Sequence, residues 1–144
     1  MSVRLVPAAG PHHARAFLDS NVPLYLLSAD ARKADVAERL VSAGGMASVQ
    51  VLNEMASVLL GKWRVEWPIV REVLAAVRAT CGIGVATLAV HERALDLAQR
   101  DGLGIHDATI VATALEADCS VLYSEGLQHG RVFGRRLRVV DPFR

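Results

Sequence analysis

Short apolar runs alternate with longer segments of helical pattern along the chain, and this alternation restricts the possible folds more than any other feature. Apolar runs bounded by glycine or polar residues indicate buried strands, and apolar residues spaced three and four apart indicate helices. Strands that alternate with helices form a mainly parallel sheet with helices on both faces. We therefore expect a three-layer α/β/α fold, with strands at Ala16–Leu18 and at 46–49, 82–88, 120–125 and 136–144.

Capping residues, glycines and one proline mark where the helices between these strands begin and end. Ser48 and Thr87 are N-cap candidates, because a side-chain oxygen there accepts a hydrogen bond from the first helical turn. Gly61 and Gly102 are stop signals, and Pro68 has to lie in a first turn, where its missing N–H is tolerated. The expected helices cover residues 23–29, 30–45, 48–62, 65–82, 87–102 and 105–119.

The composition is that of one soluble domain. A chain of 144 residues can enclose a hydrophobic core, and 52% hydrophobic residues exclude a disordered chain. No apolar run reaches the roughly 18 residues of a membrane span, and the two widely spaced cysteines suit free thiols in a reducing cytoplasm. We expect a cytoplasmic protein with an N-terminal extension at 1–14, where His12 and His13 are surface residues, and a single domain at 15–144.

The formal net charge is only +1, so no global field attracts a polyanion, but the basic residues are unevenly distributed. Five arginines lie near the C-terminus. They form either a solvated face or a phosphate-binding patch, and the sequence leaves both interpretations open. These residues are Arg131, Arg135, Arg136, Arg138 and Arg144.

Acidic residues occur where parallel α/β sheets bind ligands, at the carboxyl ends of strands. Asp19 directly follows the first expected strand, and Ser124 and Glu125 directly follow the SVLY segment of a later one. The sequence therefore predicts that these three residues lie at the functional edge of the sheet.

Two further acids occupy unusual positions on helices. Asp107 lies one turn before Ile110 and Val111 on the apolar stripe of its helix, and Glu54 lies within the stripe of helix 48–62 or at its border. Unpaired buried carboxylates are costly, so these acids and the one at the strand end need a shared positive charge. Mg²⁺ or Mn²⁺ supplies it, because both take oxygen ligands and a few carboxylates with waters suffice.

Each acid also has an ordinary structural explanation. Asp19 is placed to cap the following helix, Asp107 to interact with the positive end of its own helix dipole, and Glu54 to reach solvent through its long side chain. The metal hypothesis depends on the three acids occurring together.

Three segments in order resemble motifs of the PIN domain family, in particular the VapC-type toxins of bacterial toxin–antitoxin pairs. FLDSNVPLYLL is similar to the family's opening strand with its acid, and SVQVLNEMASVL to its Glu-bearing helix. LGIHDATIVATALEADCSVLYSEGLQHG is similar to its block of Asp-bearing helix and strand. The resemblance spans residues 15–141; each motif alone is weak, and their order makes the combination specific.

The resemblance implies a metal-dependent endoribonuclease, the toxin of a type II toxin–antitoxin pair, which hydrolyses RNA phosphodiester bonds. It implies Asp19 and Asp107 as direct ligands of Mg²⁺ or Mn²⁺. Glu54 is then a ligand, a water-mediated ligand or a proton acceptor. The residues implied as support for the acids and the strand-end loop are Ser20, Asn21 and Ser124.

One position departs from the family pattern. Relatives often read Ser-Glu-Asp where this chain reads Ser124-Glu125-Gly126, so the fourth acid is absent at its usual place. Either Glu125 replaces it as a catalytic residue, or Glu125 points away. The departure keeps a rival function open, a catalytically weak or inactive PIN-like module that binds RNA or protein. A phosphoacceptor Asp19 in another α/β protein is a further rival, although the accompanying acidic pair and Lys are missing.

The resemblance also implies partners. A small antitoxin would place its C-terminal segment in the acidic groove, often presenting Arg to the carboxylates in charge-assisted hydrogen bonds. RNA backbone contacts would come from the C-terminal arginines or from Lys62 and Arg64. The surfaces of segments 23–29 and 31–40 are candidates for homodimer contacts.

Overall fold

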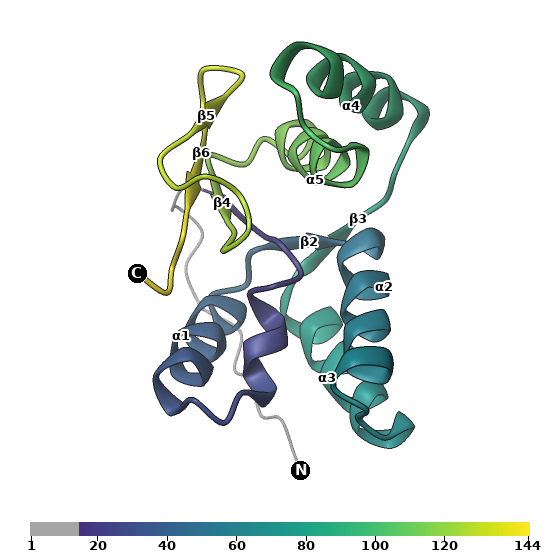
Figure 1. The fold of residues 1–144 in the computed structure, drawn as a ribbon, viewed down its shortest axis with the longest axis vertical. Coiled ribbons are helices and arrows are strands. Elements are labelled where there is room, and N and C mark those ends of the chain that lie inside the picture. Colours follow the sequence, from purple (N-terminus) through teal and green to yellow (C-terminus); the bar gives the residue numbers. More distant parts are fainter. Residues whose placement is uncertain (1–14) are drawn as a thin grey trace.

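The computed structural model describes residues 15–144, and the predicted extension at 1–14 with its two histidines lies outside them. The described chain has six short strands: β1 (Ala16–Leu18), β2 (Met46–Ser48), β3 (Gly82–Gly84), β4 (Val121–Tyr123), β5 (Val132–Phe133) and β6 (Leu137–Val140). They form one sheet in the order β3-β2-β1-β4-β6-β5, in which neighbours are parallel except for β5 and β6. The predicted fold class, a mainly parallel sheet with helices on both sides, is confirmed (Figure 1).

The helices are α1 (Ala31–Ser42), α2 (Val49–Ser57), α3 (Trp67–Thr80), α4 (Leu88–Asp101) and α5 (Ile105–Glu116), with the short helices η1 (Pro23–Leu27) and η2 (Val58–Lys62). Both predicted N-caps are confirmed, because Ser48 and Thr87 accept hydrogen bonds from backbone N–H groups of α2 and α4. Gly102 ends α4 in the left-handed conformation, with φ +71°. None of the helices in residues 15–144 is long and apolar enough to cross a membrane.

Several local predictions are wrong in part. Segment 23–29 forms only the 3₁₀ helix η1, because the chain is already extended at Ser28. The helix expected over 48–62 changes from α to π geometry at Val58, whose carbonyl accepts from the N–H of Trp63 at 3.0 Å. Strand β5 was not expected, because two residues are too few to carry a period. Strand β3 likewise covers only the first three of its seven predicted residues.

The core lies on both faces of the sheet, and α5 is its most buried helix. All side chains from Ile110 to Leu115 are buried, because α5 packs against the sheet while α4 covers its outer side (Figure 1). This explains why the helix carries apolar residues around its whole circumference instead of along one stripe.

The strand order reverses direction between β1 and β4. From β1 the chain crosses through α1 to β2 and then through α2 and α3 to β3. It returns through α4 and α5 to β4, on the other side of β1, and continues to β6. In Figure 1 these two sets of helices lie on opposite sides of the strands. Such a reversal opens a crevice at the carboxyl ends of the two strands, and Asp19 and Ser124 directly follow those ends.

Candidate functional site

Asp19 directly follows β1, at the carboxyl ends of β1 and β4 where the strand order reverses. Its backbone N–H donates to the carbonyl of Tyr123 at 3.0 Å, which extends the β1–β4 pairing by one step. Its carboxylate accepts hydrogen bonds from the Ser124 hydroxyl at 2.9 Å and from the Ser20 N–H at 2.8 Å. Only 6% of the residue is exposed to solvent. The expected position of Asp19 and Ser124 at one sheet edge is therefore present in the structure.

The environment of Asp19 opposes its negative charge. Burial is the largest cause that raises the pKa of Asp19 to about 6, and the charges of Glu54 and Asp107 raise it further. The hydrogen bonds from Ser124 and Ser20 act in the opposite direction but do not offset burial. Glu54 and Asp107, the two other acids predicted to form a cluster, thus act electrostatically on Asp19.

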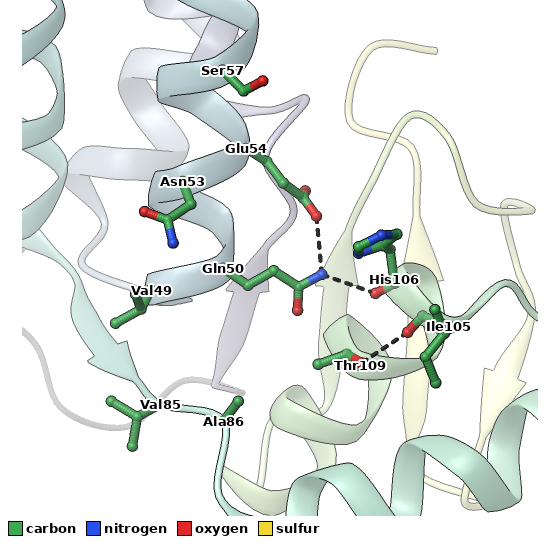
Figure 2. A pocket seen from close by; sticks show the side chains of 10 residues that line it. All are labelled: Val49, Gln50, Asn53, Glu54, Ser57, Val85, Ala86, Ile105, His106 and Thr109. Carbon is green, nitrogen blue, oxygen red and sulfur yellow. Dashed lines mark hydrogen bonds between the residues drawn. The ribbon is translucent and has the colours of Figure 1, made fainter.

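Glu54 approaches this site from α2 and is held by two donors. The Ser20 hydroxyl donates to Glu54 Oε2 at 2.9 Å, so Ser20 serves one acid with its backbone and another with its side chain. Gln50 Nε2 donates to Glu54 Oε1 at 2.9 Å and to the backbone carbonyl of His106 at 3.1 Å (Figure 2). Gln50 thereby connects α2 to the first turn of α5, which carries Asp107.

Asp107 is exposed, and the expectation that it lies on the buried stripe of α5 is wrong. The first turn of α5, from Ile105 to Asp107, is exposed throughout, and burial of the helix begins at Ala108. The apolar pattern continues into this turn, but neither the sheet nor α4 covers it. Asp107 therefore faces solvent at the crevice, within electrostatic reach of Asp19.

The donor set fits a divalent cation in chemistry, although it is not gathered into a finished coordination site. In residues 15–144 no Lys, Arg or His forms an ion pair with any of the three acids. No group of three or more possible metal ligands lies close enough together in that part of the chain. A cation would thus meet uncompensated carboxylate oxygens, which suit Mg²⁺ or Mn²⁺, and would have to draw them together.

Glu125 has partners outside this cluster. The hydroxyl of Tyr25 donates to Glu125 Oε1 at 2.6 Å, and Lys33 Nζ lies 3.7 Å from Oε2. The backbone N–H of Glu125 donates to Asn21 Oδ1 at 3.0 Å, so Asn21 holds the loop after β4. Of the two alternatives left open by the sequence, these contacts favour a side chain turned away from the acids. Gly126, where the fourth acid of the family pattern is missing, has room for a side chain, because an added Cβ would lie 3.4 Å from the side-chain nitrogen of Asn21, an ordinary van der Waals distance.

A pocket of about 770 Å³ opens beside Glu54, between α2, the first turn of α5 and the segment after β3 (Figure 2). It is lined by Val49, Gln50, Asn53, Glu54, Ser57, Val85, Ala86, Ile105, His106 and Thr109. Neither the pocket nor Gln50 was found from the sequence. Gln50 lies four residues before Glu54, a spacing that places both on one helix face, and this was the available signal.

The C-terminal arginines are only partly available to a ligand. Arg136 donates to the carbonyl of Leu115 at 2.6 Å and forms an ion pair with Asp118. Arg131 donates to the carbonyl of Asp101 at 3.1 Å. Arg131 and Arg136 thus connect the last strands to α4 and to the end of α5. These contacts leave fewer of the five arginines free to bind phosphate.

The fold and site define a three-layer α/β domain with a buried carboxylate, that of Asp19, at its topological switch point and two further acids on the neighbouring helices. The sequence profile of the PIN domain matches residues 16–132. The chain therefore belongs to the PIN domain family. A comparison with curated proteins gave no match.

Solved structures with the same fold include members of toxin–antitoxin pairs. A toxin–antitoxin complex from Klebsiella pneumoniae matches with a TM-score of 0.66 and 23% identity, over 88% of this chain and 97% of that one. VapC20 of Mycobacterium tuberculosis, described as a toxin that cleaves the sarcin–ricin loop, matches with a TM-score of 0.58 and 23% identity, over 76% and 88%. VapBC2 from Rickettsia felis, bound to promoter DNA, matches with a TM-score of 0.62 and 16% identity, over 88% of this chain and 98% of that one. These likenesses show a common fold.

Proposed function

We propose that this protein is a metal-dependent endoribonuclease and the toxin of a type II toxin–antitoxin pair. The observation that carries the proposal is the buried carboxylate of Asp19, whose pKa of about 6 reflects burial and two neighbouring acids without a compensating cation. Membership of the PIN domain family and the likeness to toxin structures, one of them named for cleaving an RNA loop, support it.

The proposal gives each residue of the crevice a separate task. Asp19 and Asp107 would hold Mg²⁺ or Mn²⁺ directly, and the bound cation would supply an activated water and a positive charge beside the phosphate. Glu54, at the edge of the open pocket, accepts a proton from the attacking water. Ser20 and Ser124 hold Asp19 in place through the hydrogen bonds described above.

Glu125 receives a supporting role in this proposal instead of a catalytic one. Its side chain is engaged by Tyr25 and Lys33, and its backbone by Asn21. Glu125 thus fixes the loop after β4 against η1 and α1, which keeps Ser124 directed at Asp19.

Cleavage of RNA tests the proposal directly. Wild type should cleave structured RNA in Mg²⁺ or Mn²⁺ and lose activity in EDTA, and Asp19→Asn should lose it in both metals. Asp96→Asn, which removes an exposed acid of α4, is the matched control and should cleave normally. Robust cleavage by Asp19→Asn would show that the proposed site is wrong.

The proposed partners are RNA and a small antitoxin. An Arg presented by the antitoxin would form charge-assisted hydrogen bonds with the uncompensated acids of the crevice. Exposed Lys62 and Arg64 would contact the RNA backbone. Induced expression in the cytoplasm should arrest growth for wild type and not for Asp107→Asn, and co-expression of the small protein encoded next to the gene should restore it.

A homodimer is part of the proposal, with contacts through η1 and α1. Leu26, Leu27, Val36 and Leu40 are only partly buried in the described chain and would be covered in a dimer. Light scattering of the purified protein measures the mass; a monomer at micromolar concentration would contradict this part alone.

A catalytically inactive PIN module is the second candidate, favoured by Gly126 and by the absence of a gathered ligand group in residues 15–144. Metal binding without cleavage of several structured RNAs would support it over the nuclease.

A further inference from the structure

Gln50 joins the two helices that flank the crevice through a neutral side chain. Its single nitrogen donates to Glu54 Oε1 on α2 and to the His106 carbonyl at the start of α5. In Figure 2 the side chain extends from α2 across the gap toward α5, with both contacts on the same nitrogen. Both N–H bonds of the amide are used.

The oxygen of the same amide is left without a partner. Gln50 Oε1 is buried and accepts no hydrogen bond from the described residues. An unsatisfied buried acceptor destabilises a fold, so such groups are rare and call for an explanation. The side chain donates to Glu54 and to the His106 carbonyl, and its own oxygen is left without a donor. This arrangement indicates that the role of Gln50 is to position those two acceptors.

The neutral charge of Gln50 matters as much as its geometry. A Lys or Arg in its place would also donate to Glu54, but its positive charge would compensate the acids that a cation has to meet. A glutamine orients the carboxylate and leaves its charge uncompensated. Ser20, the other donor to Glu54, is also neutral and likewise leaves the charge of the carboxylate uncompensated.

We propose that Gln50 is a positioning residue of the acidic site: it fixes the Glu54 carboxylate beside Asp19 and sets the spacing between α2 and the turn that carries Asp107. This inference rests on the proposed metal-dependent function. Groups that orient metal-site carboxylates in this way typically change metal affinity or activity by 10–100-fold when replaced.

The test compares two near-isosteric replacements of amides in the same pocket. Gln50→Met removes the hydrogen bonds of Gln50 and keeps its length. Asn53→Leu is the matched control, because Asn53 lines the pocket from the same helix and its exposed side chain makes no hydrogen bond within residues 15–144. Titration with Mn²⁺, followed by calorimetry, should give a dissociation constant at least 10-fold weaker for Gln50→Met and unchanged for Asn53→Leu. Equal affinities in wild type and Gln50→Met, or equal losses in both variants, would overturn the inference.

A second measurement needs no metal. In crystal structures of the metal-free proteins, Glu54 should keep its contact with Ser20 in wild type and Asn53→Leu, and leave it in Gln50→Met. A purely structural role would lower the melting temperature of Gln50→Met with Glu54 in its original place, and that result would refute the inference. Failure of the wild type to bind Mn²⁺ would instead refute the proposed function, while the position of Glu54 would still decide the role of Gln50.

Discussion

Replacing Asp19 by asparagine should stabilise the metal-free protein at neutral pH, although Asp19 is central to the proposed site. The pKa of Asp19 is raised from 3.8 to about 6, first by burial and then by the charges of Glu54 and Asp107. Each unit of difference between the folded and unfolded pKa corresponds to about 1.4 kcal/mol. The ionised carboxylate therefore weakens folding by about 3 kcal/mol above pH 6.

The hydrogen bonds of the carboxylate are already contained in this figure. Ser124 and Ser20 both donate to Asp19, and both bonds lower its pKa, so the value of about 6 is what remains after they have acted. Neutral asparagine resembles the protonated carboxyl, so the expected gain stays at about 3 kcal/mol, or about 9 °C in melting temperature for a domain of this size.

The pH dependence identifies the cause of the gain. Because folded Asp19 binds its proton more tightly than the unfolded chain does, wild-type stability falls as pH rises through the interval between 3.8 and about 6. At about pH 3.5, below the unperturbed pKa of 3.8, the carboxyl is largely protonated in both states, so the advantage of asparagine disappears. Thermal unfolding in EDTA at this pH and at pH 7.5, with Asp96→Asn as control, measures both effects. A gain that is equal at the two pH values, or a loss at pH 7.5, would refute the reasoning.

Three further predictions concern the rest of the site. Mg²⁺ or Mn²⁺ should raise the melting temperature of wild type more than that of Asp107→Asn, which lacks one charged ligand, and a thermal-shift titration measures the difference. Gly126→Asp should strengthen Mn²⁺ binding, because its Cβ makes only an ordinary contact with Asn21 and adds a fourth acid; an unchanged dissociation constant in calorimetry would contradict this. Tyr25→Phe should lower the free energy of unfolding by about 1–2 kcal/mol in urea, because its hydroxyl donates to Glu125; equal stability would show that the contact contributes nothing.

The parts of the fold that could be predicted depend on local signals. The run Ala16–Leu18 ends at an acid and is a strand with those limits, and Ser48 and Thr87 cap the helices that follow them. The position of Asp19 at a functional edge followed from the alternation of strands and helices, because parallel strands place their carboxyl ends together.

The parts that could not be predicted depend on contacts between distant segments. The exposure of Asp107 depends on where the sheet stops covering α5, and no pattern within the helix records that limit. The partners of Glu125 lie on η1 and α1, about a hundred positions earlier for Tyr25. Gln50 carries a recognisable spacing to Glu54, but its second contact, with His106, depends on how two helices approach each other.

The burial of α5 has a consequence for how a ligand at the crevice would change the motions of the protein. Backbone amides within residues 110–115 are enclosed and should exchange with deuterium only when the whole domain opens, whereas those of the exposed first turn should exchange through local fluctuations. Asp107 thus lies in the exposed first turn of the most buried helix. A ligand that holds Asp107 has to order one turn only, and the boundary of slow exchange should move from Ala108 toward Ile105 when it binds.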